Sequence, residues 1–171
     1  MAKSRASLPV ALEPLSRQHW PAAQVIYEEG LATGHASFET EAPDWPSWDA
    51  GHLPHSRLVA VLAGQVAGWA ALASVSRRMA YAGVAEVSVY VAARSRGQGV
   101  GRLLLSELIR QSEAAGIWTL VASIFPENPA SIRLHEVCGF RLLGRRERIG
   151  RQHGVWRDTL LYERRSAISG L

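Results

Sequence analysis

One stretch of the chain, residues 86–108, constrains the fold more than any other. Val87, Val89, Tyr90 and Val91, four of its first six residues, are β-branched or aromatic, which is the density typical of a strand. Three glycines follow at alternate positions, Gly97, Gly99 and Gly101, and an apolar helical pattern begins directly after them. Glycines let a ligand lie against the backbone, and the first N–H groups of a helix have no intrahelical partner. This strand–loop–helix unit therefore predicts a binding site for a phosphate or a pyrophosphate.

The residues around the glycines decide which kind of phosphate loop this is. A P-loop requires Lys and then Ser or Thr after its last glycine, whereas this chain has Arg102 and Leu103. A dinucleotide-binding fingerprint requires G-x-G-x-x-G near the start of βαβ units, and here G-x-G-x-G stands in the middle of the chain. A tight turn or a helix cap is the alternative without a ligand. Arg94 and Arg96 add positive charge, which favours an anionic ligand.

The composition is that of a soluble globular protein. The chain has 171 residues, of which 47% are hydrophobic and 20% charged, and this size suits one domain with a substantial core. Cys138 is the only cysteine, so no intramolecular disulfide can form and we expect a cytoplasmic location. The apolar stretch 58–73 is too short to span a membrane, and residues 1–17 lack the apolar segment of a secretory signal.

The net charge of +4 comes largely from arginines, five of which lie between residues 141 and 151. Such a patch can bind nucleic acid, but no aromatic residues interleave with these arginines. We therefore interpret the patch as a solvated strand face that also attracts an anionic ligand, and we predict no nucleic-acid or membrane partner. The histidines show no metal-ligand spacing with acidic or cysteine residues, which predicts no metal site.

The hydrophobic pattern predicts one α+β domain over residues 8–165, between a flexible lead at 1–7 and a flexible tail at 166–171. Ser16 is the expected N-cap of the first helix, and Gly30 its expected end. Strands 84–91 and 118–124 are joined by a helix, so we expect them to lie parallel in a mixed, mostly antiparallel sheet with helices on both faces. The other predicted strands are 8–14, 57–62, 66–75, 140–148 and 155–164, and the predicted helices are 17–29, 45–53, 100–115 and 129–137.

Several motifs together carry a resemblance to a known family. Arg96-x-x-Gly99-x-Gly101 after a strand resembles the coenzyme A loop of the GNAT acetyltransferase superfamily, and residues 128–140 resemble its N-x-x-[AS]-x-x-x-[YH]-x-x-x-G-[FY] segment. Within it, the chain is similar to the phosphinothricin and methionine sulfoximine acetyltransferases through Phe38-Glu39, Arg78-x-x-Tyr81, Glu86-x-Ser88-Val89-Tyr90-Val91 and His153-Gly154-x-Trp156-x-Asp158.

The resemblance covers roughly residues 8–164 and implies both an activity and an architecture. The implied activity is acetyl-CoA-dependent transfer of acetyl to the amine of a small amino-acid-like acceptor, by direct attack in a ternary complex. The implied architecture is a GNAT-like domain whose central parallel strands splay apart, assembled as a homodimer. Acetylation of a protein or peptide amine, and coenzyme A binding without turnover, are the alternatives.

The resemblance also implies roles for individual residues of the cofactor site. Asn128 and Ser131 would contact coenzyme A, although an asparagine before Pro129 is also typical of a turn. Backbone amides would hold the cofactor along the strand and the loop, at Val89, Tyr90, Val91, Arg96, Gly97, Gln98, Gly99, Val100, Gly101 and Arg102.

Attack on a thioester requires a neutral amine, and because amine pKa values are about 10 a proton acceptor must lie nearby. Glu86 is the only acidic residue between Ala82 and Ala93, and the resemblance implies that it is the general base, acting through water. A solvent-facing strand glutamate is the alternative. His135 stands where many GNAT enzymes have a tyrosine that protonates the leaving thiolate. It is either that acid, a substrate contact or a hydrogen-bonded core residue.

Three residues are implied on the acceptor side. Phe38 would form a wall of the pocket, with a small satellite core as its alternative. Arg78 and Tyr81 would contact the anionic end of the acceptor, because a planar guanidinium suits a carboxylate or a phosphinate; solvated turn residues are the alternative. Gln152 departs from the lysine that often precedes the His-Gly-x-Trp run, which weakens the expectation that phosphinothricin itself is the acceptor.

Overall fold

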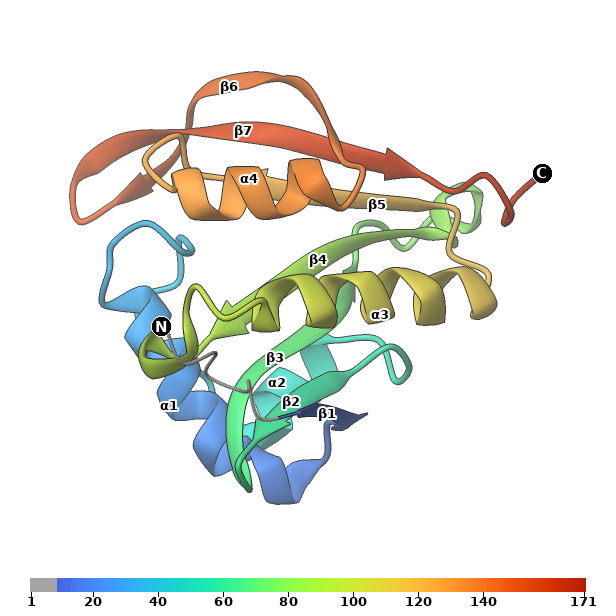
Figure 1. The fold of residues 1–171 in the computed structure, drawn as a ribbon. Helices are drawn as coiled ribbons and strands as arrows, with labels where there is room; N and C mark the ends of the chain where they lie inside the picture. The colour runs from blue at the N-terminus through green and yellow to red at the C-terminus, as the bar shows by residue number, and fades with distance from the viewer. Residues whose placement is uncertain (1–8) are drawn as a thin grey trace, which may run out of the picture.

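A seven-stranded mixed sheet, in the order β1-β2-β3-β4-β5-β7-β6, forms the centre of the fold (Figure 1). The computed structural model describes residues 9–171, so the lead expected at 1–7 lies outside the described residues. The strands are β1 (Val10–Pro14), β2 (Leu58–Leu62), β3 (Gln65–Ser74), β4 (Val84–Val91), β5 (Thr119–Ile124), β6 (Arg141–Gln152) and β7 (Val155–Arg165). The helices are α1 (Trp20–Leu31), α2 (Trp45–Gly51), α3 (Val100–Ala114) and α4 (Pro129–Val137), with short 3-10 turns η1 (Arg17–His19), η2 (Met79–Tyr81) and η3 (Ala93–Ser95).

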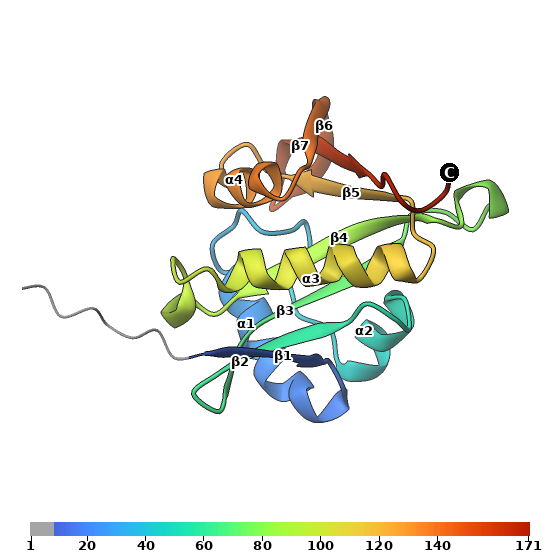
Figure 2. The same ribbon diagram turned by 45° about the vertical axis from the view of Figure 1, so that its right-hand side comes forward.

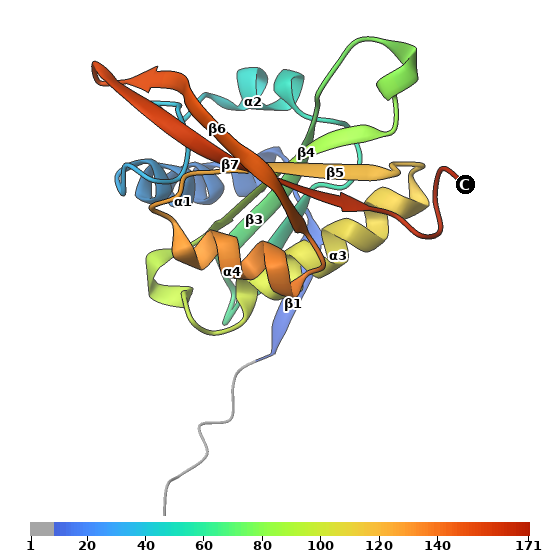
Figure 3. The ribbon, with the colours of Figure 1, turned by 90° about the horizontal axis from the view of Figure 1, so that it is seen from above.

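The helices cover both faces of the sheet, as predicted (Figure 3). On one face, α3 buries an apolar stripe that includes Leu104, Leu105 and Leu108 against the strands, and α4 packs beside it. On the other face, α1 and α2 enclose an aromatic cluster, in which Trp48 and Trp69 are each 1% exposed. The helix predicted at 45–53 is thus present as α2, and its Trp48 faces the core.

The parallel pairing of β4 with β5 is confirmed, and it is short. The register joins only Val84 to Thr119, Ala85 to Leu120 and Glu86 to Val121, although both strands continue beyond these pairs. Figures 1 and 2 show the two strands together at one end and separating towards the other. The remaining neighbours in the sheet pair antiparallel. The splayed central pair expected from the resemblance is present.

Several local predictions are corrected by the structure. The first helix begins at Trp20 after η1, and it passes through Gly30 to end at Leu31. Gly30 serves as a contact point, because a Cβ there would lie 2.7 Å from Cδ1 of Tyr90 on β4. Within the apolar pattern after the glycines, Leu103 is not part of the buried stripe of α3, because it is 46% exposed. The strand expected to end at residue 148 continues to Gln152, with register shifts along it.

The end of the chain, after β7, is held by Arg165. The guanidinium of Arg165 donates to the main-chain oxygens of Ser166 (2.9 Å), Ser169 (2.8 Å) and Gly170 (2.6 Å). The flexibility expected for the tail at 166–171 stays a prediction. Within residues 9–171, none of the helices combines the length and the apolar character needed to cross a bilayer.

Gly83 fixes the joined end of the splayed pair, and its replacement is expected to destabilise the fold. Its carbonyl accepts hydrogen bonds from the N–H groups of Trp118 and Thr119, and a Cβ would lie 2.1 Å from Cε3 of Trp118. Overpacking of this kind costs about 1–3 kcal/mol, so Gly83→Ala should lower Tm by several degrees. Gly144→Ala is the matched control, because a Cβ there meets nothing within 4 Å. An equal Tm for the two variants in calorimetry would contradict this account.

Candidate active site

The glycine loop presents open backbone at the start of α3. Gly97 and Gly99 have φ angles of 72° and 82°, and a Cβ on either would meet nothing within 4 Å. Gly99 is the N-cap of α3 and no side chain caps the helix, so the N–H groups of its first turn keep no intrahelical partner. The next glycine, Gly101, is not open but packs against α4, because a Cβ there would lie 3.3 Å from Leu134. The loop is thus an open anion cradle that its own side chains do not fill.

The main chain of β4 continues this cradle into the space between the splayed strands. Ala92 N–H donates to the Ala67 carbonyl at 2.9 Å, which makes this a hydrogen-bonded pair of the antiparallel β3–β4 ladder. Because such pairs alternate along a ladder, the main-chain groups of Tyr90 also face β3, whereas those of Val89 and Val91 face the opposite side. The Val91 carbonyl accordingly accepts from Nε of Arg96 at 3.4 Å. The expectation that the amide of Tyr90 faces the cofactor is corrected; Tyr90 stacks on Trp69.

Glu86 lies where β4 and β5 separate. It pairs with Ala73 of β3 and with Val121 of β5, and Val121 is the last residue of β5 in register with β4. Side chains alternate along a strand, so Glu86 shares the face of Tyr90, which packs in the α1–α2 aromatic cluster. Val89 and Val91 pack on the opposite, α3 side. The carboxylate is half-buried, and it stands at the root of the gap on the face away from α3.

The connection between α1 and α2 lies against β5 and β6 on this same side. The ring of Phe38 meets Phe125 edge to face at 4.8 Å, and a Cβ on Gly150 would lie 2.6 Å from Cζ of Phe38. The amide of Gln152 donates to the Ser37 carbonyl at 2.8 Å. Phe38 is thus part of a small aromatic contact on this side of the sheet, and its role as a wall of the acceptor pocket stays a prediction.

A buried glutamine and an arginine hold that connection in place. Gln152 is 7% exposed, and its Oε1 accepts from Nη1 of Arg157 at 3.1 Å. Arg157 also donates to the Gly34 carbonyl at 3.1 Å and lies 4.2 Å from the centroid of Phe125. A lysine at position 152 would have no acceptor for Arg157 and would repel it. Gln152, present here in place of the expected lysine, thus serves to bond both Ser37 and Arg157.

Gln152→Ala is expected to loosen the connection between α1 and α2. The substitution removes the bonds to Ser37 and to Arg157 and leaves buried polar groups without partners. We expect faster amide hydrogen exchange over residues 33–40 and an acceptor KM raised about tenfold, with the Kd of coenzyme A unchanged. Arg151→Ala is the control, since Arg151 is exposed and donates only to the Gly154 carbonyl. Unchanged exchange in Gln152→Ala would contradict the role given to this bond.

The residues expected around α4 are engaged with one another. Asn128 caps α4, because its Oδ1 accepts from Ser131 N–H at 3.1 Å, and its Nδ2 donates to the His35 carbonyl at 3.1 Å. His135 is 4% exposed, and its Nδ1 lies 2.8 Å from the Ser131 carbonyl. Because a carbonyl only accepts, Nδ1 carries the proton, and Nε2 is buried without a hydrogen-bond partner among residues 9–171. Burial lowers the pKa of His135, so the ring stays neutral and its Nε2 has no proton to give.

Arg78 and Tyr81 lie on another part of the surface from Phe38. Both belong to the β3–β4 connection and have exposed side chains, and Arg78 N–H donates to Ser76 Oγ at 3.2 Å. Figures 1, 2 and 3 place this connection and the α1–α2 connection at different ends of the sheet. The structure therefore brings Phe38 towards the ends of β5 and β6, and it leaves Arg78 and Tyr81 beyond the start of β4.

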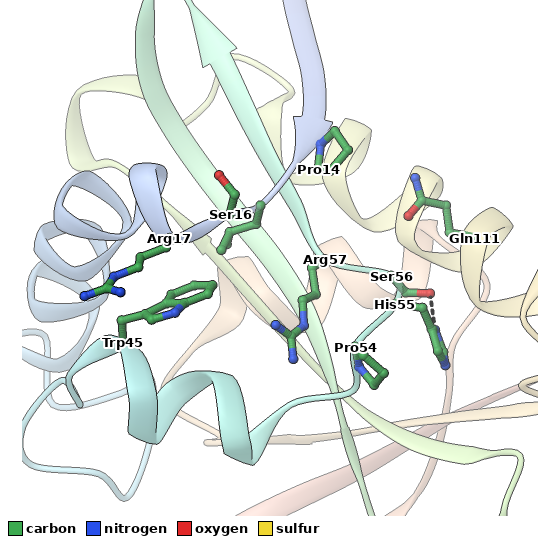
Figure 4. Close-up of a pocket in the computed structure, with 10 residues that line it drawn as sticks. Pro14, Ser16, Arg17, Trp45, Pro54, His55, Ser56, Arg57 and Gln111 are labelled. Carbon is green, nitrogen blue, oxygen red and sulfur yellow. Dashed lines mark hydrogen bonds between the residues drawn. The ribbon is translucent and has the colours of Figure 1, made fainter.

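A surface cavity of about 320 Å³ opens far from the glycine loop, between the end of β1, α2 and α3 (Figure 4). Its lining includes Gln111, which is eleven residues, or about 16 Å of helix, from the start of α3. Arg57 in its wall is neutralised by Asp49 and donates to the carbonyls of Asp49 and His52. The cavity is thus distant from the glycine loop, and Glu86 is not among its lining residues. Among the described residues, no cluster of His, Cys, Asp and Glu could hold a metal ion.

Comparison with known proteins places the chain in a family. Residues 17–140 match the acetyltransferase (GNAT) family, and the chain belongs to it. A phosphinothricin N-acetyltransferase of Alcaligenes faecalis is 39% identical over 153 residues, which cover 84% of this chain and 76% of that protein. A phosphinothricin acetyltransferase from Sinorhizobium meliloti, solved with acetyl-CoA, superposes with a TM-score of 0.83 at 29% identity, covering 94% of this chain and 90% of that one. A ribosomal-protein-alanine N-acetyltransferase from Brucella melitensis superposes with a TM-score of 0.83 at 30% identity, covering 91% of this chain and 99% of that one.

Proposed function

We propose that this protein is an acetyl-CoA-dependent N-acetyltransferase whose acceptor is the amine of a small amino-acid-like molecule. The single observation that carries the proposal is the separation of β4 from β5 directly after Glu86, beside an open glycine loop. This arrangement offers an anion cradle on one side of the sheet and a carboxylate at the root of the gap. The names of the relatives support the acceptor class.

The cofactor is assigned to the residues whose backbone is open. The N–H groups from Gly97 to Arg102 would hold the diphosphate, helped by the positive end of the α3 dipole. The main-chain groups of Val89 and Val91 would pair with the amides of the pantetheine arm, as a β-strand would. Acetyl-CoA, when bound, supplies the thioester whose acetyl group is transferred. Asn128 and Ser131 would act mainly by fixing the start of α4, and α4 would form the far wall of the cofactor site.

Glu86 is assigned the general-base role. An ammonium group has no lone pair for attack, so the acceptor must lose a proton before its nitrogen bonds to the acetyl carbon. The carboxylate of Glu86 takes that proton, directly or through one water, at the point where the strands part. His135 is assigned a positioning role, because its neutral ring holds the Ser131 carbonyl and so braces the first turn of α4.

The resemblance to a ribosomal-protein-alanine N-acetyltransferase motivates a second candidate, acetylation of a peptide N-terminus. A peptide needs an open groove, whereas here Phe38 lies on Gly150 and the α1–α2 connection is bonded to Gln152, Arg157 and Asn128. These contacts favour a small acceptor. The test is a panel of free amino acids, methionine sulfoximine, phosphinothricin and Ala-initiated peptides, with release of free thiol as the readout. Faster turnover of peptides than of free amino acids would contradict the proposal.

We also propose that the protein works as a cytoplasmic homodimer. The hairpin of β6 and β7 exposes apolar side chains, among them Val155 (60% exposed) and Trp156 (56% exposed). A second copy of the chain would cover this surface and remove it from water. Light scattering on the full chain tests the proposal, and a monomer at micromolar concentration would contradict it.

A further inference from the structure

Arg146 of β6 reaches across the sheet on the same face as Glu86. Its Nε donates to Thr159 Oγ1 of β7 at 3.3 Å, and its Nη2 donates to Ser123 Oγ of β5 at 3.0 Å. In the register, Arg146 pairs with Thr159, which is 2% exposed. The side chain thus runs from the edge strand over β7 to β5, and it is exposed to solvent along this path.

The position of Ser123 relates this guanidinium to the reacting end of the site. Ser123 follows Val121, the register partner of Glu86, by two residues, so the side chains of Ser123 and Glu86 lie on one face. Two residues of a strand span about 6.6–6.8 Å. The same alternation places Phe125 on this face, where it meets Phe38. Arg146 therefore borders the space between Glu86 and Phe38, within the dimensions of an amino acid.

The partners of Arg146 distinguish it from three ion-paired arginines on β6 and β7. Arg145 pairs with Asp158 at 2.5 Å, Arg141 with Glu163 at 3.0 Å, and Arg157 with Glu127 at 3.3 Å. Over residues 9–171, no carboxylate lies within ion-pair distance of Arg146, whose two side-chain partners are neutral hydroxyls. Those hydroxyls use two of its five N–H donors and fix the plane of the guanidinium, so three donors and a full positive charge stay available.

We propose that Arg146 binds an oxyanion of the acceptor and so selects amino acids over uncharged amines. The inference rests on the proposed acetyl-transfer function and adds a specificity residue to it. A fixed guanidinium gives a carboxylate or a phosphinate charge-assisted hydrogen bonds, and the acceptor amine is then directed to Glu86. Ser123 and Thr159 are positioning residues, because they act through Arg146.

Kinetics at saturating acetyl-CoA test the proposal with Arg146→Gln and the neighbouring control Arg145→Gln, whose side chain pairs with Asp158. Methionine sulfoximine is compared with its carboxamide, which lacks the α-carboxylate, and phosphinothricin with methionine sulfone, which lacks the second anion. Arg146→Gln should raise KM about 30-fold to 100-fold for the acceptor that carries the recognised oxyanion, with little change for its neutral analogue. Arg145→Gln should stay within about twofold of the wild type.

Calorimetry supplies a second readout, with acceptor titrated into the complex of enzyme and coenzyme A, where no transfer occurs. Acceptor affinity should fall in Arg146→Gln, whereas the affinity for coenzyme A should not. An equal KM change for charged and neutral acceptors, or the same change in Arg145→Gln, would overturn the assignment. A wild type that acetylates amides as well as acids would overturn it too, while leaving acetyl transfer intact. A wild type that releases no thiol with any amine would refute the proposed function, and calorimetry would then decide whether an oxyanion still binds at Arg146.

Discussion

Glu86→Gln is expected to lower kcat about a hundredfold or more at neutral pH, because it removes the proposed acceptor of the substrate ammonium proton. The amide is nearly isosteric with the carboxylate, and the side chain lies on the face opposite the α3 core. The Kd of coenzyme A should therefore stay close to that of the wild type. Initial-rate assays of thiol release measure kcat, and calorimetry with coenzyme A measures its Kd.

The pH profile separates loss of a base from general damage. Without Glu86, turnover depends on amine that is already neutral, and that fraction rises about tenfold per pH unit below the amine pKa of about 10. The rate of Glu86→Gln should climb steeply from pH 7 to pH 9, whereas the wild-type rate should level off. Glu147→Gln, at an exposed glutamate on β6, is the matched control and should behave as wild type. Equal turnover of Glu86→Gln and wild type across this range would remove Glu86 from the mechanism.

Gly99→Asp is expected to weaken coenzyme A binding about a hundredfold. Gly99 is the N-cap of α3 with φ of 82°, and its open side is the space assigned to the diphosphate. A carboxylate there would repel phosphate at a few ångströms, an interaction worth a few kcal/mol near a protein surface. Calorimetry with coenzyme A measures the loss. Binding of S-acetylpantetheine, which has no diphosphate, should change far less.

Gly116→Asp is the control for backbone strain. Gly116 follows the other end of α3, has φ of 86°, and also meets nothing within 4 Å of a Cβ. Both substitutions place an aspartate in the left-handed region, so both should cost similar stability. Only Gly99→Asp should change the affinity for coenzyme A. Equal losses of affinity in the two variants would mean that strain, and not charge at the loop, weakens binding.

Local patterns were sufficient to predict the framework of the site. The alternating valines, the three glycines and the apolar stripe after them specify strand, loop and helix within 23 residues, and the helical connection makes β4 and β5 parallel. The family resemblance added the splay between them. Gly30 was misassigned as a helix end because glycine also permits close approach, and only the position of Tyr90 across the core distinguishes the two uses.

The acceptor side could not be predicted in the same way, because it depends on contacts between distant segments. Gln152 bonds to Ser37 across 115 positions, and Arg146 reaches Ser123 across 23. Such pairs depend on sheet register, and the register shifts within β6 move its side chains relative to those of β7. Alternation alone indicates which strand residues share a face with Glu86. Once the register of β5 against β4 is known, it places Ser123 on that face as a candidate site residue. No local signal points to Arg146.

Titration of the ¹⁵N-labelled protein with coenzyme A tests the central claim most directly, because it reports on the main-chain amides themselves. The largest amide shifts should fall on residues 97–102 and on Val89 and Val91, while the amide of Tyr90, which faces β3, should shift little. Shifts concentrated instead around Arg17, Trp45 and Arg57, at the cavity in Figure 4, would contradict the claim that the glycine loop and the splayed strands hold the cofactor beside Glu86.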